Sequence, residues 1–231
     1  MTIEAILATW PAVELRAAGG FTLRRGAGGG NRTSAATLDG MSGDIPAAEA
    51  AMRAWEQRPV FMIRPGEAAL DADLAARGYE AYDHTRVLAA SAAPLAGADP
   101  ERAFFGDMRL RVLEEVWAPG GIGPERVAVM ARAPGPKIYL LGRHGDRVGG
   151  AGFAAIHGDA VVMHAVEVTP AARRTGIGAA MVRAAAAWGR ERGAGRLLLA
   201  VTQANVGATA LYRGLGFEEA AAYHYRRAPA A

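Results

Sequence analysis

The order of hydrophobic and polar positions in the C-terminal half predicts a mixed α/β sheet. Three apolar stretches with strand character come first, at residues 138–141, 148–156 and 161–168. A helix over 176–192, a strand over 196–201, a helix ending at Gly216 and a strand over 223–225 follow them. Asp146 and Asp159 stand between the first three stretches, where short hairpin turns favour aspartate. We therefore expect the first strands to be antiparallel and the later ones parallel.

The same pattern predicts the structure of two other segments of this half. The helix over residues 176–192 has one apolar face and should pack on the sheet; the face consists of Ile177, Ala180, Met181, Ala184, Ala185 and Trp188. Residues 100–133 are expected to form one or two helices with a glycine-rich break at 120–123.

The N-terminal half repeats this order of elements. The pattern predicts a helix over about residues 47–57, a strand over 60–63, a helix ending at Gly78 and a strand through 85–88. Residues 76–80, Ala-Arg-Gly-Tyr-Glu, match 214–218, Gly-Leu-Gly-Phe-Glu, in register with the elements around them. We interpret the chain as a duplicated α/β unit. The alternative is that helix, glycine, aromatic residue and strand follow one another in many unrelated folds.

A segment without hydrophobic periodicity separates the two halves. Residues 88–100 contain Pro94, Pro100 and mostly small side chains, which is typical of a linker. We predict one domain over residues 1–90, a linker over 91–100 and a second domain over 101–231.

Composition narrows the classes of function. The net charge of +3 is small and dispersed, so it suits an anionic ligand and gives no support for nucleic-acid binding. The chain has no cysteine, which excludes disulfides, thiolate metal sites and a covalent cysteine intermediate. Its 5 histidines show no metal-ligand spacing, so we expect no metal.

The cellular location is predicted from the start of the chain and from its apolar runs. The start Met1-Thr2-Ile3-Glu4 has an acid where a signal peptide has positive charge, and no apolar run is long enough for a membrane span. Lys137 is the only lysine beside many arginines and alanines, which is typical of a GC-rich bacterial genome. We expect a cytoplasmic bacterial protein, a monomer or homodimer, without a membrane partner.

The turn before the helix at 176–192 is the strongest chemical signal. It reads Arg173, Arg174, Thr175, Gly176, Ile177 and Gly178. A helix start offers unpaired backbone N–H groups and the positive end of the helix dipole, and the glycines leave room for a phosphate oxygen near those donors. The pattern predicts a pyrophosphate-binding loop. A P-loop would need a lysine here, and a dinucleotide-binding turn a third glycine at Met181. The alternative is that the glycines only ease a tight turn.

A second motif follows the strand over 196–201. Asn205 suits the N-cap of the next helix, and Tyr212 lies close to two turns further along, on the same side of that helix. Each residue alone is usually structural. In this order after the glycine loop, however, the sequence over about residues 100–227 resembles the GCN5-related N-acetyltransferase superfamily.

The resemblance implies an acetyltransferase fold in the C-terminal half, with acetyl-CoA as co-substrate. Residues 173–178 then correspond to the pyrophosphate loop and Asn205 to a second cofactor contact, while backbone groups around Val166 and Val168 would bind the pantetheine arm. The N-terminal half resembles a degenerate copy, because it lacks the Arg-x-x-Gly-x-Gly pattern and has Leu74 where Tyr212 would align.

The implied reaction is direct transfer of the acetyl group to a primary amine of a small molecule or a protein. Tyr212 is the candidate that protonates or orients the departing thiolate; a tyrosine pKa near 10 and a thiol pKa near 8.5 make full transfer uphill by roughly 2 kcal/mol. Some members of the superfamily carry a glutamate where this chain has the apolar run 199–201. Glu167 is the best remaining general base, with His164 or a water relay as alternatives.

The missing glutamate leaves a second function open, that of a non-catalytic acyl-CoA-binding or regulatory module. The resemblance places the acceptor near residues 104–116. The N-terminal half could also line the acceptor-binding pocket, and its candidate residues are Trp10, Arg24 and Arg25.

Overall fold

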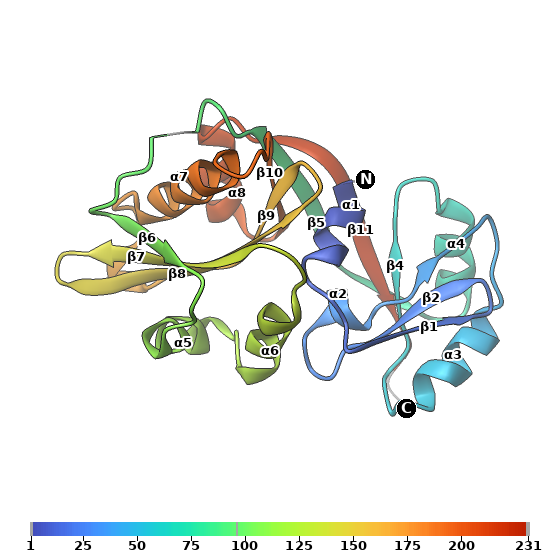
Figure 1. Ribbon diagram of the computed structural model, residues 1–231. Coiled ribbons are helices and arrows are strands. Elements are labelled where there is room, and N and C mark those ends of the chain that lie inside the picture. Colours follow the sequence, from blue (N-terminus) through green and yellow to red (C-terminus); the bar gives the residue numbers. More distant parts are fainter. Residues whose placement is uncertain (1, 96, 230–231) are drawn as a thin grey trace. The chain divides into compact units, whose positions relative to one another are not determined.

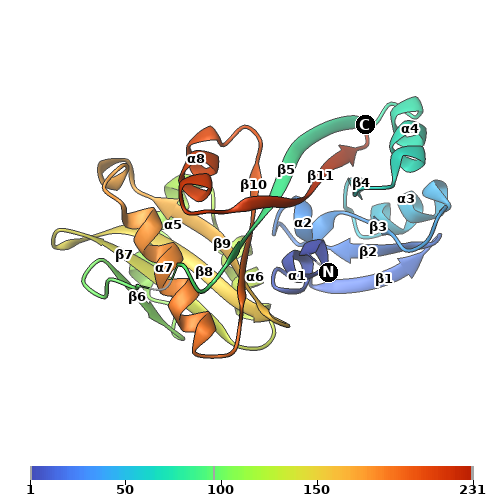
Figure 2. The ribbon, with the colours of Figure 1, turned by 90° about the horizontal axis from the view of Figure 1, so that it is seen from above.

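The computed structural model describes residues 2–95 and 97–229, and Figures 1 and 2 show it from two sides. The chain forms two compact units. Unit 1 contains the residues up to Trp10, Val87–Val201 and Asn205–Ala220, and unit 2 contains Pro11–Arg86, Thr202–Ala204 and the residues from Ala221 onward. Each unit thus draws on both halves of the sequence. The division into domains over 1–90 and 101–231 stays a prediction.

Unit 1 is a mixed sheet with helices on both faces, as Figure 1 shows for α7 above and α5 and α6 below. Its strands are ordered β5-β10-β9-β8-β7-β6. Their bounds are β5 (Glu80–Ser91, of which the end lies in this unit), β6 (Ala103–Gly106), β7 (Lys137–His144), β8 (Arg147–His157), β9 (Ala160–Val168) and β10 (Arg196–Thr202). Strands β6 to β9 pair antiparallel and β9 pairs parallel with β10, so the predicted change of direction is confirmed.

The helices of unit 1 cover two separate apolar cores. They are α1 (Thr2–Ala8), α5 (Arg111–Trp117), α6 (Pro124–Arg132), α7 (Ile177–Arg190) and α8 (Val206–Gly214), with short 3-10 turns η1 (Ala118–Gly120) and η2 (Pro170–Ala172). One core lies under α7 and contains Met181 and Trp188, and the other contains Trp117 and Phe153. The middle of β8 is buried on both sides because a core lies on each face. The predicted apolar face of α7 is confirmed, since all six of its residues are buried.

Glycines in the sheet set how closely α7 approaches it. A Cβ added at Gly142 would lie 2.3 Å from Ile177 Cγ2, and one added at Gly150 would lie 2.9 Å from Met181 Cε. The first two turns of the helix therefore rest on bare backbone. A side chain at Gly142 would push Ile177 and the helix start away from the strands, at a typical cost of about 1–3 kcal/mol.

Unit 2 contains a small antiparallel sheet and a second group of strands. The sheet is formed by β1 (Glu14–Ala18), β2 (Phe21–Arg25) and β3 (Thr37–Leu38); the other elements are α2 (Asn31–Ser34), α3 (Ile45–Arg53), β4 (Val60–Ile63), α4 (Ala68–Ala76), the first part of β5 and most of β11 (Glu218–Arg227). Strand β11, from the end of the sequence, pairs antiparallel with β4. Phe21, Phe61 and Tyr79 stack edge to face in its core.

The repeated order of elements is visible in the two copies of the helix before the last strand. Helices α4 and α8 have nine residues each and end in the same way. Gly78 and Gly216 follow them with positive φ of 81° and 83°, a conformation that favours glycine. The next residues, Tyr79 and Phe217, are both buried. The duplication predicted from the matching segments is therefore reproduced in local structure.

Several elements differ from the sequence-based expectation. Helix α3 begins earlier than expected, directly after the Asp44 cap, and ends earlier, ahead of Glu56 with its positive φ of 58°. The hairpin β1–β2 and the short strands β3 and β6 were not predicted. None of the helices within the described ranges is long and apolar enough to cross a membrane.

Candidate active site

Strands β9 and β10 are paired over only part of their length. The parallel register joins Ala160–Met163 to Arg196–Leu199 and goes no further, although both strands continue. Within the residues that the structure describes, 165–168 of β9 and 200–201 of β10 are therefore not joined to each other. We call these residues the open end of the β9–β10 pair. Val166 and Val168, the predicted pantetheine contacts, lie there.

A β-bulge explains why the pairing stops. The register of β8 against β9 shifts between Ala151 and Phe153, and Ala165 takes a positive φ of 51°. The buried Trp117 donates its indole N–H to the Ala165 carbonyl at 2.8 Å. A positive φ costs an alanine on the order of 1–2 kcal/mol, so this contact and the packing around it hold the bulge. Bulges bend a strand and end its pairing.

The predicted phosphate loop directly follows the open end. Gly176 caps α7 with a positive φ of 88°, and the first helical hydrogen bond runs from Ala180 N–H to the Gly176 carbonyl. No acceptor within the described part of the chain meets the N–H groups of residues 177–179. Thr175 Oγ1 donates to the Ala172 carbonyl at 2.7 Å and closes the loop on itself. The helix start thus presents free donors, which is the arrangement that binds phosphate.

The two glycines of the loop have different roles. Gly176 needs its positive φ, and a Cβ there would lie 3.4 Å from the guanidinium of Arg102. Gly178 is buried, and a Cβ there would lie 2.9 Å from Leu211 Cδ2 on α8. From the sequence, both glycines were expected to make room for a phosphate oxygen. For Gly178 the structure supplies a packing reason, the close approach of α7 and α8.

Glu167 and Arg173 lie together beside the open end. Arg173 Nε donates to the Val168 carbonyl at 3.3 Å, and its guanidinium is 3.7 Å from the Glu167 carboxylate. The Glu167 side chain also lies against Gly120, where an added Cβ would be 2.6 Å from Oε2. The structure therefore joins the candidate base to the first arginine of the loop.

His164, the alternative base, is part of the apolar interior. It is buried, and its Nε2 lies 2.8 Å from Thr9 Oγ1. Because Thr9 donates its single hydroxyl proton to the Ala5 carbonyl, His164 Nε2 must be the donor in this pair. Its ring lies 4.9 Å from that of Trp10. These contacts hold helix α1 and speak for a structural role.

Asn205 and Tyr212 share helix α8 but have different surroundings. Asn205 is exposed, and its side chain accepts from Ala208 N–H at 3.0 Å, so the predicted N-cap is confirmed. Tyr212 is buried in the core under α7, with its ring 5.6 Å from that of Phe217. Burial raises the pKa of Tyr212 to about 12. Full proton transfer to a thiol of pKa near 8.5 then costs roughly 5 kcal/mol, more than the unperturbed value indicated.

The residues expected around the acceptor divide into two groups. Near the expected 104–116 segment, β6 and the following loop expose apolar side chains: Phe104, Phe105, Met108 and Leu110. Trp10, by contrast, is buried against Phe153 and His164. Its surroundings are those of a core residue, so its indole is a poor candidate for lining the acceptor-binding pocket.

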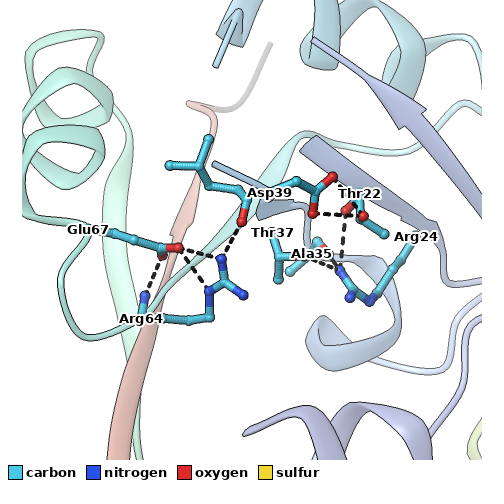
Figure 3. Close-up of polar contacts among 8 residues, drawn as sticks. Thr22, Arg24, Ala35, Thr37, Asp39, Arg64 and Glu67 are labelled. Atoms are coloured by element: carbon cyan, nitrogen blue, oxygen red, sulfur yellow. Dashed lines mark hydrogen bonds and ion pairs between the residues drawn. The ribbon is translucent and has the colours of Figure 1, made fainter. Parts of the chain in front are cut away.

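Arg24 belongs to a polar cluster of unit 2, drawn in Figure 3. Its guanidinium donates to the Ala35 carbonyl at 3.1 Å and to Thr37 Oγ1 at 2.9 Å. Burial, and then the charge of Arg64, lowers the pKa of Arg24. Arg25 is exposed and lies 3.8 Å from the Glu14 carboxylate. Both arginines therefore have partners within their own unit.

Sequence reasoning missed Arg102. Its guanidinium donates to the Thr175 carbonyl and lies over Gly176. No local pattern links Arg102 to Thr175, which lies 73 positions away. In the described part of the chain, no cluster of three His, Cys, Asp or Glu side chains has the geometry of a metal site.

Comparisons with known proteins agree with this geometry. Residues 107–217 match the model of the acetyltransferase (GNAT) family. The chain is 39% identical over 102 residues to the streptothricin acetyltransferase of Streptomyces lavendulae, a match covering 42% of this chain and 52% of that protein. The chain thus spans about half the length of this curated relative.

Two solved structures share the fold over most of the chain. One is a GCN5-related N-acetyltransferase from Kribbella flavida, with TM-score 0.68, 20% identity, and coverage of 95% of this chain and 91% of that one. The other is a tandem GNAT protein from the clavulanic acid biosynthesis pathway, with TM-score 0.59, 14% identity, and coverage of 91% and 78%. The predicted mixed sheet with an acetyltransferase fold in the C-terminal half is confirmed.

Proposed function

Because this chain belongs to the GCN5-related N-acetyltransferase superfamily, we propose that it moves the acetyl group of acetyl-CoA to a primary amine. The observation that carries the proposal is the start of α7. Its free N–H groups stand beside Arg173 and Arg174 and directly follow the open end of the β9–β10 pair. Such a helix start suits the pyrophosphate of the co-substrate.

Each part of acetyl-CoA has a proposed partner. The pyrophosphate is held by the loop Arg173, Arg174, Thr175, Gly176, Ile177 and Gly178. The pantetheine arm, which carries amide groups, bonds to the backbone of Val166 and Val168 as an added strand would. Asn205, exposed at the start of α8, supplies a third contact.

The proposed reaction is direct transfer. The amine nitrogen attacks the thioester carbonyl carbon, the C–S bond breaks, and the sulfur leaves with the bonding electron pair. A backbone N–H at the open end stabilises the charge that develops on the carbonyl oxygen. Because the chain has no cysteine, no cysteine acyl intermediate intervenes.

Two side chains handle the protons in this proposal. Glu167 accepts the proton of the attacking amine, directly or through a water molecule. Its carboxylate is partly exposed and lies beside the open end, which supports this role. Tyr212 donates a hydrogen bond to the departing sulfur. Its raised pKa favours this bond over complete transfer of its proton.

We propose a small-molecule amine as the acceptor, with a protein amino group as the alternative. Support comes from the similarity to streptothricin acetyltransferase, an enzyme named for the small-molecule amine streptothricin. The exposed apolar side chains of Phe104 and Phe105 suit an acceptor with an apolar surface next to its amine.

The proposal is tested with acetyl-CoA and a panel of amines, by thiol release and by thermal shift. We expect acetyl-CoA to raise the melting temperature, and Gly176→Val to abolish this rise. Gly195→Val is the matched control, because a side chain at Gly195 would meet nothing within 4 Å. Glu167→Gln should keep the thermal shift and lose most of the turnover. No shift of the native protein at millimolar acetyl-CoA would overturn the proposal.

Two observations favour a second function, a non-catalytic acyl-CoA-binding or regulatory module. The raised pKa of Tyr212 makes it a weak acid, and residues 199–201 carry no carboxylate. Acetyl-CoA binding without thiol release across the whole amine panel would favour this module. Turnover of any amine would exclude it.

A further inference from the structure

Arg102 is a charged side chain with a fixed position and without a carboxylate partner. In the part of the chain that the structure describes, its guanidinium donates to the Thr175 carbonyl and forms no ion pair. Both terminal nitrogens lie 3.4 Å from the place of a Gly176 Cβ. The charge therefore lies against the residue that caps α7.

The backbone around Arg102 holds it in this place. Its N–H donates to the Asp99 carbonyl at 3.1 Å, and its own carbonyl accepts from Arg143 N–H at 2.8 Å. The Asp99 carboxylate accepts from Glu101 N–H at 3.0 Å and fixes the same turn. Arg102 is thus anchored at the point where β6 begins its pairing with β7.

We propose that Arg102 is a further acyl-CoA-binding residue, whose guanidinium contacts the pyrophosphate held at the start of α7. The inference rests on the proposed function of the loop. An anion bound to the free N–H groups of residues 177–179 would lie beside Gly176 and hence within reach of this guanidinium. Arginine is suited to the task because its planar fork of donors matches phosphate oxygens.

The geometry also explains why this position takes glycine. A side chain at Gly176 would have to adopt the positive φ of 88°, and its Cβ would lie in contact with the guanidinium. The loop is consequently bracketed by cations from two places in the sequence, Arg102 before β6 and Arg173 and Arg174 after β9.

The test compares Arg102→Gln with the native protein and with Arg190→Gln. The control removes the same charge at the other end of α7, where Arg190 is exposed. Isothermal titration with CoA should show binding about 10- to 100-fold weaker for Arg102→Gln, as expected for one charge-assisted contact. Arg190→Gln should bind as the native protein does.

A second measurement separates phosphate binding from support of the loop. S-acetylpantetheine carries the thioester without phosphate groups. If Arg102 binds phosphate, Arg102→Gln raises the KM for acetyl-CoA and leaves kcat/KM for S-acetylpantetheine unchanged. An equal loss with both donors, or unchanged CoA affinity, would overturn the inference alone. Failure of the native protein to bind CoA would instead overturn the proposed function.

Discussion

Helices α3 and α7 occupy the same place in the two copies of the repeat but begin in opposite ways. At α7 the cap is Gly176, and the N–H groups that follow it are free. At α3 the cap is Asp44, whose carboxylate accepts from Ala47 N–H at 3.0 Å, and Pro46 has no N–H to offer. A helix start that already holds a carboxylate has neither the donors nor the charge to bind a phosphate.

The strands before these helices can be compared in the same way. In unit 2, Ala36 forms a parallel bridge with Phe61, as β9 does with β10. Just past this bridge the guanidinium of Arg64 donates to the Leu38 carbonyl and pairs with Glu67 (Figure 3). An arginine thus meets a strand carbonyl in both copies, since Arg173 donates to the Val168 carbonyl. The two copies differ at the helix start, where Asp44 fills the donors of α3 and, among the described residues, the N–H groups of 177–179 have no acceptor.

The largest expected effect comes from giving α7 the cap of α3. In Gly176→Asp the new carboxylate would take the place of the phosphate and pair with Arg102, and we expect CoA affinity to fall by at least about 100-fold, since like charges in contact cost several kcal/mol. Gly176→Asn is the matched control, because it brings the same shape and backbone strain without the charge. Titration calorimetry and the melting temperature of the free protein give the measurement. Equal affinities for the two variants would contradict the electrostatic account.

A smaller effect is expected when the N-terminal copy loses its internal partner. Arg64→Ala removes the contacts to Leu38 and Glu67, and should lower the free energy of unfolding by about 1–3 kcal/mol, measured in urea. Arg77→Ala, which breaks an exposed pair with Asp73, should lower it far less, because solvent screens an exposed ion pair. We expect CoA to bind at one equivalent per chain in both variants. A second equivalent in Arg64→Ala would show that Arg64 blocks a site able to bind the cofactor.

Local features of the site could be predicted from the sequence. The strand β10, the helix α7 with its apolar face, and the Asn205 cap depend on residues within a few positions of one another. Periodicity and capping report such short-range interactions directly. The same holds for the hairpin turns at Asp146 and Asp159.

The features that shape the site depend on distant residues and left no local signal. Ala165 has a positive φ because its carbonyl meets Trp117, which lies 48 positions away. The place of Arg102 over Gly176, and the fit of α7 on Gly142, likewise arise only once the sheet is formed. The pairing of β11 with β4 across most of the sequence is another such feature. Interactions of this kind are set by packing, which single-sequence patterns do not contain.

The smallest expected effect concerns Leu74 and Tyr212, which lie at equivalent places in the last turns of α4 and α8, one aliphatic and the other a phenol. Tyr212→Phe makes this position apolar in both copies. Because the pKa of Tyr212 is raised to about 12, the native protein has its full stability below pH 10 and loses part of it as the pH rises from 10 towards 12, whereas the Phe variant escapes this loss.

For the reaction of Tyr212→Phe we expect kcat to fall by about tenfold or less, as for one hydrogen bond to sulfur, with no change in its pH profile between pH 6 and about 9. A kcat loss of about 1000-fold would instead identify Tyr212 as a full proton donor, and would set the two copies apart by chemistry as well as by binding.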